Sequence, residues 1–488
     1  MSLRAQGGTE DLAHFAAELK PGDLDPAVVA RAGELFLDWI GSAVGGRHER
    51  PTKILAEFSA KMGPQDGMSE SVGRPGGSSP FFAALVNAAS SHVLEQDDLH
   101  APSVLHPGTV VFPAALAVAQ DLGSSGAEFL SAVVVGYEVG ARVGRFLGPS
   151  HYEVFHTTGT AGTLAAAAAA SRLMGADSEV MLHSLGSAGT QAAGLWEFLR
   201  DAADSKQLHT AKAAANGVLA AWTAQRGLTG ARRVLEGQQG MGAGMSRDVN
   251  QEALVEGLGE RWAVLETSLK LHACCRHTHP SADALEAAML EHRLGPGVVR
   301  LVRARVHQAA IDVLAPVLDP QTPHQARFSM AFVLALIAIQ GRAGVEDFKL
   351  RLHDPEVRRF MEKVEMVYDP EVDAAYPERW EGSIEIETVG GLHIESRLDY
   401  PRGDPLNPLS RAEIVEKVDR LVRLGGGTAA GAGSMVDRIL RLDREPEVGS
   451  ILGPLLWAGS SANASLVKIG SVEESGDVPE PEERAHGA

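Results

Sequence analysis

The chain has 488 residues, enough for two or three domains, and 44% of them are hydrophobic and 22% charged, as in a globular protein. Aspartate and glutamate outnumber lysine and arginine by 63 to 44, so the net charge is −19 with histidine neutral. Since no segment forms a basic stripe, and an acidic surface is repelled by phosphates and anionic lipids, we expect no nucleic-acid partner and no membrane partner.

Three further features favour a cytoplasmic protein. Residues 1–10 lack the apolar segment of a signal peptide, and the longest apolar run, residues 330–339, is far shorter than the roughly 18 residues of a membrane span. The only cysteines, Cys274 and Cys275, are adjacent, and neighbouring cysteines rarely form a relaxed disulfide. We therefore expect a protein of the reducing cytoplasm.

Helical patterns dominate the first part of the chain. Asp25-Pro26 combines a cap residue with proline at the first helical position, and apolar residues then recur at three- and four-residue spacing until Gly45-Gly46. Further apolar segments of helical length, many of them rich in alanine, occupy residues 80–94, 113–121, 127–147, 160–174, 179–187 and 211–226. These segments predict a bundle of buried helices packed through small residues.

From residue 298 the pattern indicates strands. Residues 298–307 form a short segment with several β-branched side chains, as in a strand. Residues 383–388 and 392–398 alternate apolar and polar side chains on either side of Gly390-Gly391, which predicts a hairpin. Helices are expected at 323–340 and 355–363, and again at 410–424 and 434–441 after Asn407-Pro408. We predict a mainly α fold: a large helical domain built from both chain ends (1–268 and 406–470), an inserted smaller α+β domain (269–405) and a disordered acidic tail (471–488).

Four segments carry candidate site residues. The first, residues 94–108, joins two helices and holds Glu95, Asp97, Asp98, His100 and His106. Such a loop can supply a general base, or a carboxylate that orients a histidine, although helix capping and solvation explain most acidic loops. A metal site is a weaker interpretation, because the spacing matches no ligand set.

The second segment, residues 155–163, leads into an alanine-rich helix. Backbone amides at the start of a helix favour a bound anion, so the amides around Thr157 and Gly159, with His156 beside them, form a candidate anion site. A tight helix crossing is the alternative explanation of the small residues in this segment. The third segment places Lys206 and His209 three residues apart, on one face if helical. Cations there suit a carboxylate ligand, but a lone lysine in such a place is usually a surface residue.

The fourth segment, residues 270–280, contains Lys270, Cys275, Arg276 and His277 at the expected domain junction. It matches no closed zinc framework, whereas arginine binds carboxylates through two parallel hydrogen bonds, so an anion pocket is favoured over a metal. No signature supports a Cys275 nucleophile. The sequence also lacks the nucleotide-binding, dinucleotide-binding, serine-hydrolase and zinc-protease motifs, which leaves acid–base chemistry without a cofactor.

Taken in order, these segments resemble the MmgE/PrpD family, which includes 2-methylcitrate dehydratase, cis-aconitate decarboxylase and iminodisuccinate epimerase. The resemblance covers about residues 10–465 and lies in residues 91–98 with 105–107, 155–163, 205–209, 270–280 and 407–411. It implies a helical domain with an α+β lid, a homodimer, and an active site in the cleft that needs no metal or organic cofactor. By position, His106, His156 and Lys206 match family residues around the substrate, and Lys270 begins the matching basic block.

Four positions depart from the decarboxylase pattern. Glu95 stands where that pattern has aspartate, Leu99 replaces a threonine, Phe332 falls on a tyrosine and Cys275 falls on a histidine. The missing hydroxyls and imidazole argue against cis-aconitate decarboxylation, but not against the other activities of the family.

We therefore expect a lyase that acts on a small polycarboxylate by removing a proton next to a carboxylate, with an activity like that of 2-methylcitrate dehydratase. Epimerisation, isomerisation or decarboxylation of a di- or tricarboxylate is the alternative within the family. A non-catalytic anion-binding protein is the alternative outside it.

The expected roles follow from charge and hydrogen-bonding capacity. Lys206, Arg276 and the amides of residues 157–159 would hold the carboxylates. His106 or His156 would be the base, and Asp98 would orient an imidazole. His106, His156, Lys206 and Arg276 are predicted to meet in one cleft between the domains.

Overall fold

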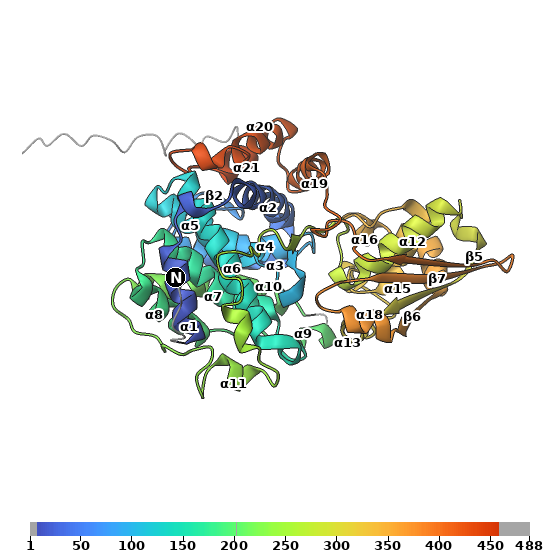
Figure 1. Ribbon diagram of the computed structural model, residues 1–488. Coiled ribbons are helices and arrows are strands. Elements are labelled where there is room, and N and C mark those ends of the chain that lie inside the picture. Colours follow the sequence, from blue (N-terminus) through green and yellow to red (C-terminus); the bar gives the residue numbers. More distant parts are fainter. Residues whose placement is uncertain (1–6, 202, 458–488) are drawn as a thin grey trace, which may run out of the picture.

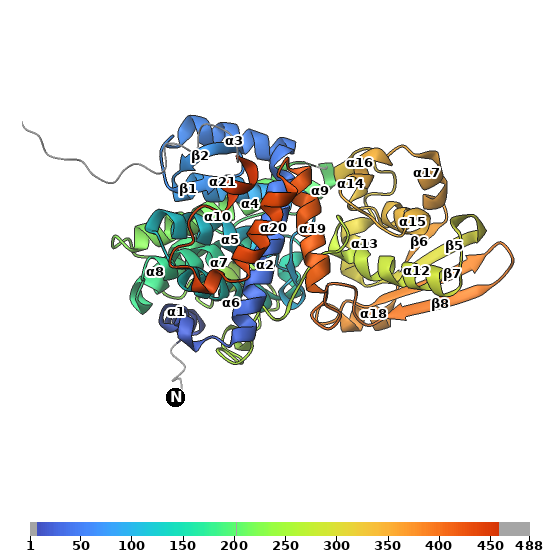
Figure 2. The same ribbon diagram turned by 90° about the horizontal axis from the view of Figure 1, so that it is seen from above.

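The computed structural model describes residues 7–201 and 203–457, so the predicted tail at 471–488 lies outside the described residues. Figures 1 and 2 show two lobes side by side: a larger lobe of helices, and a smaller lobe that combines helices with a sheet. Helices predominate, which confirms the predicted mainly α fold. None of the described helices is both long and apolar enough to cross a membrane.

The helical lobe contains most of the first 268 residues. Its helices are α1 (Gly8–Glu18), α2 (Pro26–Gly45), α3 (Arg50–Met62), α4 (Pro80–His92), α5 (Gly108–Leu122), α6 (Gly126–Tyr152), α7 (Thr157–Leu173), α8 (Ser178–Gly189), α9 (Phe198–Asp201), α10 (Ser205–Ala224) and α11 (Met241–Met245). Two short pairs of strands accompany them: β1 (Ser69–Ser71) with β2 (Arg74–Ser78), and β3 (Leu99–His100) with β4 (Thr267–Ser268).

Helix α7 lies at the centre of this lobe and packs against α5, α6 and α10. The helices approach closely because they meet through alanine and glycine, as predicted. A Cβ atom added to Gly217 of α10 would lie only 2.5 Å from the Cβ atom of Ala166 in α7. The ends of these closely packed helices carry the candidate site.

Several helices begin earlier than the sequence pattern predicted, and two of them, α5 and α10, bear on the site. Helix α5 starts at Gly108 and contains Pro113 instead of starting near it. Proline removes one amide donor from the helix, but the surrounding residues of α5 are buried and packing holds the helix together. Helix α10 starts at Ser205, so Lys206 and His209 lie in its first two turns.

The smaller lobe is built on a four-stranded sheet. Its elements are α12 (His279–Glu291), β5 (Val299–Val306), α13 (Gln308–Leu314), α14 (Pro323–Ala326), α15 (Met330–Gln340), α16 (Asp347–Leu350), α17 (Pro355–Met361), β6 (Val364–Tyr368), α18 (Pro370–Ala375), β7 (Gly382–Thr388) and β8 (His393–Leu398). The strand order is β6-β5-β7-β8, with β5 and β6 parallel and the other pairs antiparallel. Three of these strands match the predicted segments, and β6 was missed.

The chain then returns to the helical lobe through α19 (Arg411–Leu424), α20 (Ala429–Ile439) and α21 (Leu452–Leu456). Helices α19 and α20 pack against α2, and Figure 2 shows them alongside it, with α19 next to the smaller lobe. Residues of α19 and α20 belong to the same hydrophobic core as α2, whereas the smaller lobe has a core of its own.

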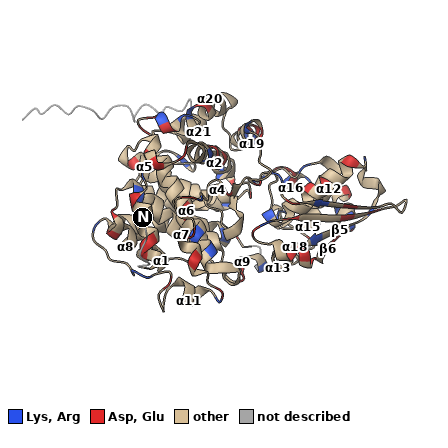
Figure 3. Ribbon diagram, in the orientation of Figure 1, with Lys and Arg blue, Asp and Glu red and all other residues tan. Residues whose placement is uncertain are grey.

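The chain passes between the lobes twice, near Leu269 and near Gly403, and these two crossings are joined by a hydrogen bond. The Leu269 amide donates to the Gly403 carbonyl at 2.8 Å. Gly403 has a φ of +84°, and a Cβ atom there would lie 1.9 Å from the Leu269 carbonyl oxygen, so only glycine fits. Figure 3 shows acidic and basic residues interspersed over both lobes.

Candidate active site

The loop between α4 and α5 brings three buried acidic side chains together. Glu95, Asp97 and Asp98 are each at most 4% exposed. Glu95 adopts a φ of +56°, in the left-handed region that non-glycine residues avoid. A conformation of this kind persists only where surrounding contacts hold it, and it is common at functional sites.

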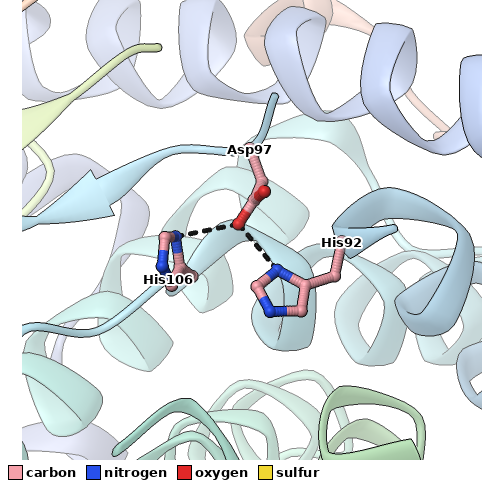
Figure 4. Close-up of side chains that lie close together, drawn as sticks. All are labelled: His92, Asp97 and His106. Atoms are coloured by element: carbon pink, nitrogen blue, oxygen red, sulfur yellow. Dashed lines mark hydrogen bonds and ion pairs between the residues drawn. The ribbon is translucent and has the colours of Figure 1, made fainter. Parts of the chain in front are cut away.

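Asp97 connects two imidazoles through one carboxylate oxygen. Its Oδ2 atom lies 2.9 Å from Nδ1 of His92 and 2.8 Å from Nδ1 of His106, as Figure 4 shows. Nδ1 of His106 is also 2.6 Å from the Asp98 carbonyl oxygen. Because both partners of this nitrogen are acceptors, Nδ1 of His106 carries the proton, and Nε2 is left as a free base.

Asp98 does not orient an imidazole through its side chain, contrary to the sequence-based prediction. Its Oδ1 atom accepts from the Gly108 amide at 2.9 Å, and its Oδ2 atom accepts from the Tyr137 hydroxyl at 2.5 Å. Burial raises the pKa of Asp98 to about 7, although the Tyr137 hydrogen bond acts in the opposite direction. The side chain holds the start of α5, and the neighbouring Asp97 is the carboxylate that contacts the histidines.

Two lysines neutralise the acids of this loop. Lys206 forms a buried ion pair with Glu95, and Nζ of Lys270 lies 3.2 Å from the other oxygen of Glu95 and 3.6 Å from Oδ1 of Asp97. Burial opposes ionisation of both carboxylates. Even so, Lys206 and Lys270 hold the pKa of Glu95 below its ordinary range. Lys270 and the two histidines do the same for the pKa of Asp97. Both carboxylates are thus charged at neutral pH.

His156 lies in a second, more deeply buried part of the same cluster. Its ring stacks on His92 with centroids 5.6 Å apart, and its Nδ1 lies 3.3 Å from Nδ1 of His209. Burial, and then the charges of His92 and His209, lower the pKa of His156 well below its ordinary value. The side chain of His106 is 13% exposed, whereas His156 is 1% exposed, so His106 is the more accessible base.

The start of α7 offers less for an anion than the sequence suggested. The Gly159 amide already donates to the His156 carbonyl at 2.8 Å. A Cβ atom on Gly159 would lie 2.6 Å from the Ala193 carbonyl oxygen, so close packing explains this glycine. Thr157 is buried beside the cluster.

Arg276 and His277 contact residues outside the histidine cluster. Nη1 of Arg276 donates to the Arg402 carbonyl at 3.2 Å and the Leu269 carbonyl at 3.5 Å, so this guanidinium ties the two chain crossings together. His277 stacks on Trp380 with centroids 4.7 Å apart and lies 3.4 Å from Nε2 of His307. The predicted meeting of four side chains therefore includes His106, His156 and Lys206 but not Arg276.

Cys275 is buried at the start of the segment that includes Arg276. Burial, and then the charge of Glu95, raise the pKa of its thiol to about 11. The thiol is therefore protonated at neutral pH, which agrees with the absence of a nucleophile signature.

A cavity of about 1450 Å³ lies between the lobes. The helical lobe contributes Tyr152, Thr157 and Trp196 to its wall, and the smaller lobe contributes Gln308 and Tyr376. The Trp196 ring also contacts the His156 ring, with centroids 5.0 Å apart. The histidine cluster thus lies directly behind one wall of this cavity.

Sequence reasoning missed His92 as a site residue and chose Asp98 over Asp97. The signals for His92 were its place in the matching block of residues 91–98 and the polar run Ser90-Ser91-His92 at the end of a largely apolar helix; the structure buries all three residues. No pattern separates Asp97 from Asp98, because adjacent side chains of a loop point in directions that periodicity does not define.

His92, Asp97 and His106 also form the geometry of a potential metal site, with ligand atoms within 4.8 Å of one another. The donor chemistry fits a metal poorly, because Nδ1 of each histidine is a hydrogen-bond donor to the same oxygen and the Lys270 ammonium already compensates Asp97. That the site works without a metal or organic cofactor stays a prediction.

Comparison with known proteins defines the class. Residues 10–253 match the MmgE/PrpD N-terminal domain, and residues 272–436 match the MmgE/PrpD C-terminal domain. The chain therefore belongs to the MmgE/PrpD family.

Several relatives are cis-aconitate decarboxylases by name. The cis-aconitate decarboxylase-like protein oryM of Aspergillus oryzae is 29% identical over 443 residues, which cover 85% of this chain and 90% of the relative. The cis-aconitate decarboxylase of Aspergillus terreus is 28% identical over 472 residues, covering 91% and 95%. That of Homo sapiens is 28% identical over 429 residues, covering 84% and 86%.

The buried histidines predict a stability that falls in mild acid. Burial, and then Lys206, lower the pKa of His92 to about 4, whereas the unfolded chain protonates histidine near its ordinary pKa of about 6.5. Between these values the unfolded state binds more protons, so the free energy of unfolding should fall as the pH decreases, by about 1.4 kcal/mol per pH unit for His92 alone. Thermal unfolding midpoints measured from pH 7 to pH 5 test this, and a midpoint that stays constant or rises would contradict it. The His92→Gln variant should show a shallower dependence.

Proposed function

We propose that this protein is a cofactor-free lyase that removes a proton next to a carboxylate of a small polycarboxylate, most readily as a dehydratase of a tricarboxylate like 2-methylcitrate. The observation that carries the proposal is the Asp97–His106 pair, whose Nδ1 contacts leave Nε2 of a partly exposed imidazole as a base, while Lys270 lies 3.6 Å from the same Asp97. Family membership supports the same class of reaction.

In this mechanism His106 begins the reaction. Nε2 of His106 takes the proton from the carbon next to a substrate carboxylate, and the electron pair of that C–H bond forms the new double bond. The carbon–oxygen bond of the neighbouring hydroxyl breaks, and the imidazolium returns its proton to the departing hydroxide, which leaves as water. Asp97 stabilises the imidazolium between these two steps, because its carboxylate already accepts the Nδ1 proton.

The lysines supply the charge that the transition state needs. Negative charge builds up on the substrate carboxylate as the proton leaves, and a fixed ammonium in a buried site stabilises that charge strongly. Lys206 and Lys270 both bind Glu95 here, so the substrate carboxylate would share these ammonium groups with Glu95. Glu95 thereby keeps the two lysines in place before the substrate arrives.

Decarboxylation of cis-aconitate is the second candidate, favoured by the names of the relatives. Two of the positions that depart from the decarboxylase pattern are apolar and buried: Leu99 packs near Trp380, and the Phe332 ring lies 5.8 Å from that of Phe348. With Cys275 protonated as well, these positions offer no charged contact for the carboxylate that leaves. This is why we place the dehydratase first.

The assembly and compartment belong to the same proposal. A homodimer is what the family resemblance implies, and a cytoplasmic location fits the two adjacent free cysteines, both buried, which suit a reducing compartment. A protein that binds an anion without catalysis is the alternative from outside the lyases.

The experiment is a screen of di- and tricarboxylates in deuterated water, followed by NMR. Loss of water from a 2-methylcitrate-like acid is the expected result. Carbon dioxide release from cis-aconitate would assign the second candidate, and deuterium exchange without loss of water would assign an epimerase. No exchange and no product with any acid would contradict the proposal and favour a binding protein.

A further inference from the structure

A buried lysine from the returning helix reaches the loop of the candidate active site. Lys417 of α19 is 3% exposed, and its Nζ atom donates to Oδ1 of Asp38 at 2.6 Å and to the main-chain carbonyl of Gln96 at 2.7 Å. Gln96 lies between Glu95 and Asp97, whose carboxylates meet the two lysines and the two histidines of the site.

The position of Lys417 within α19 is itself unusual. The buried face of this helix consists of Ile414, Val418, Leu421 and Val422, at the spacing of an apolar stripe, and Lys417 lies on that same face. Burying an ammonium is unfavourable unless it is paired and hydrogen-bonded. An apolar side chain would pack better at this position. We therefore attribute the lysine to its contacts with Asp38 and the Gln96 carbonyl.

Lys417 also continues the alternation of charge in the site. Side chains of opposite sign follow one another from the helical core into the site, namely Asp38, Lys417, Asp97, Lys270, Glu95 and Lys206. The contact between Lys417 and this row is made through the Gln96 carbonyl, and the charge of Asp97 acts on Lys417 as well. The three lysines come from three distant segments, whereas two of the three acids come from one loop.

The loop needs such a contact because its conformation is strained. Glu95 has a φ of +56°, which an L-residue adopts at a cost of roughly 1 kcal/mol. The hydrogen bond from Lys417 to the Gln96 carbonyl fixes the peptide plane between Gln96 and Asp97. It thereby also fixes the directions in which the side chains of Glu95 and Asp97 leave the backbone.

We propose that Lys417 is a positioning residue of the active site, which holds the Gln96 carbonyl so that Glu95 and Asp97 face their lysines and histidines. Its effect on the reaction rests on the proposed function, but its effect on the loop does not. The return of the chain to the helical lobe thus completes the site as well as the core.

The chain offers a matched control for the loss of a buried cation. Arg142 of α6 is 5% exposed, pairs with the buried Glu138 at 3.1 Å, and donates to the main-chain carbonyl of Glu256 at 2.8 Å. It therefore makes the same two kinds of contact as Lys417, but with a loop outside the site.

The test compares Lys417→Met with Arg142→Met. Hydrogen–deuterium exchange without substrate should speed up by about tenfold or more in the peptide that covers residues 93–101 in Lys417→Met, and should be unchanged there in Arg142→Met. With the acid that the wild type converts, kcat should fall by about 10²-fold in Lys417→Met with a smaller change in KM, because misplacing catalytic groups acts on the chemical step. Lys417→Arg, which keeps a cation able to donate to both oxygens, should recover part of the protection and of kcat.

The outcomes separate the two proposals. Equal exchange in residues 93–101 in the two methionine variants would overturn the positioning role and leave Lys417 as an ordinary buried ion pair. Faster exchange confined to Lys417→Met, in a protein that converts no acid, would support the contact with the loop while the lyase proposal fails. If Lys417→Met does not fold, the Asp38→Asn/Lys417→Met variant removes both charges together, and the same comparison applies to it.

Discussion

Replacing His106 by alanine is expected to lower kcat by about 10²–10⁴, the usual contribution of a general acid or base, while the protein stays folded. The side chain contacts Asp97 and the Asp98 carbonyl through Nδ1, and its Nε2 atom is the free base of the Asp97–His106 pair. Steady-state kinetics on the acid found by the screen measures the effect. Added imidazole should restore part of the activity, because it can enter the space that the side chain leaves.

His100 provides the control for this variant. It belongs to the same loop and is 1% exposed, but its two nitrogens contact Ser103 at 2.8 Å and Glu266 at 3.4 Å, away from Asp97. The His100→Ala variant should keep a kcat close to that of the wild type once it is compared at a temperature where it is folded. Near-normal turnover in His106→Ala would show that another group removes the proton.

Replacing Lys270 by methionine is expected to have the largest effect on stability. Lys270 is fully buried and lies within 3.6 Å of both Glu95 and Asp97, so the variant leaves two buried carboxylates with too little positive charge. Removing one partner of a buried ion pair typically costs about 3–5 kcal/mol. Urea denaturation at pH 7 measures the loss, and Arg303→Met, which breaks half-exposed pairs on the sheet, should cost no more than about 1 kcal/mol.

The pH dependence of this loss follows from the same contacts. In the wild type the pKa values of Glu95 and Asp97 are depressed, so their contribution to stability is present above about pH 4, the ordinary range of carboxylates, and is lost as the pH falls further. The gap in stability between the wild type and Lys270→Met should therefore be widest near pH 7 and should narrow below about pH 4. A gap that is the same at pH 7 and pH 3.5 would contradict the role assigned to Lys270.

Much of the fold was predictable because local patterns determined it. The alanine-rich helices and the hairpin around Gly390-Gly391 follow from periodicity and turn chemistry, and the structure contains both. Strand β6 was missed because it is a short edge strand with an irregular burial pattern. The β1–β2 pair was missed because its residues are serine, glycine, proline, arginine and glutamate, with no β-branched side chain.

The candidate site was predicted in its residue types and only partly in its contacts. His106, His156 and Lys206 come together as expected, since each lies next to a short motif with recognisable chemistry. Arg276 was misjudged because a guanidinium that binds two main-chain carbonyls has the same sequence signature as one that binds a carboxylate. Lys417 could not be found at all, since its partner Asp38 is 379 residues away and the sequence shows only a lysine in an amphipathic helix.

The most direct test of the account is a crystal structure of the protein with a tricarboxylate bound. We predict that one carboxylate of the ligand contacts Lys206 and Lys270, and that the carbon beside it lies within about 3.5 Å of Nε2 of His106, the separation of reacting atoms in a productive complex. The Asp97–His106 contact should be retained. A ligand bound at Arg276, or in the cavity between the lobes without contact to Lys206 or Lys270, would contradict the proposed mechanism.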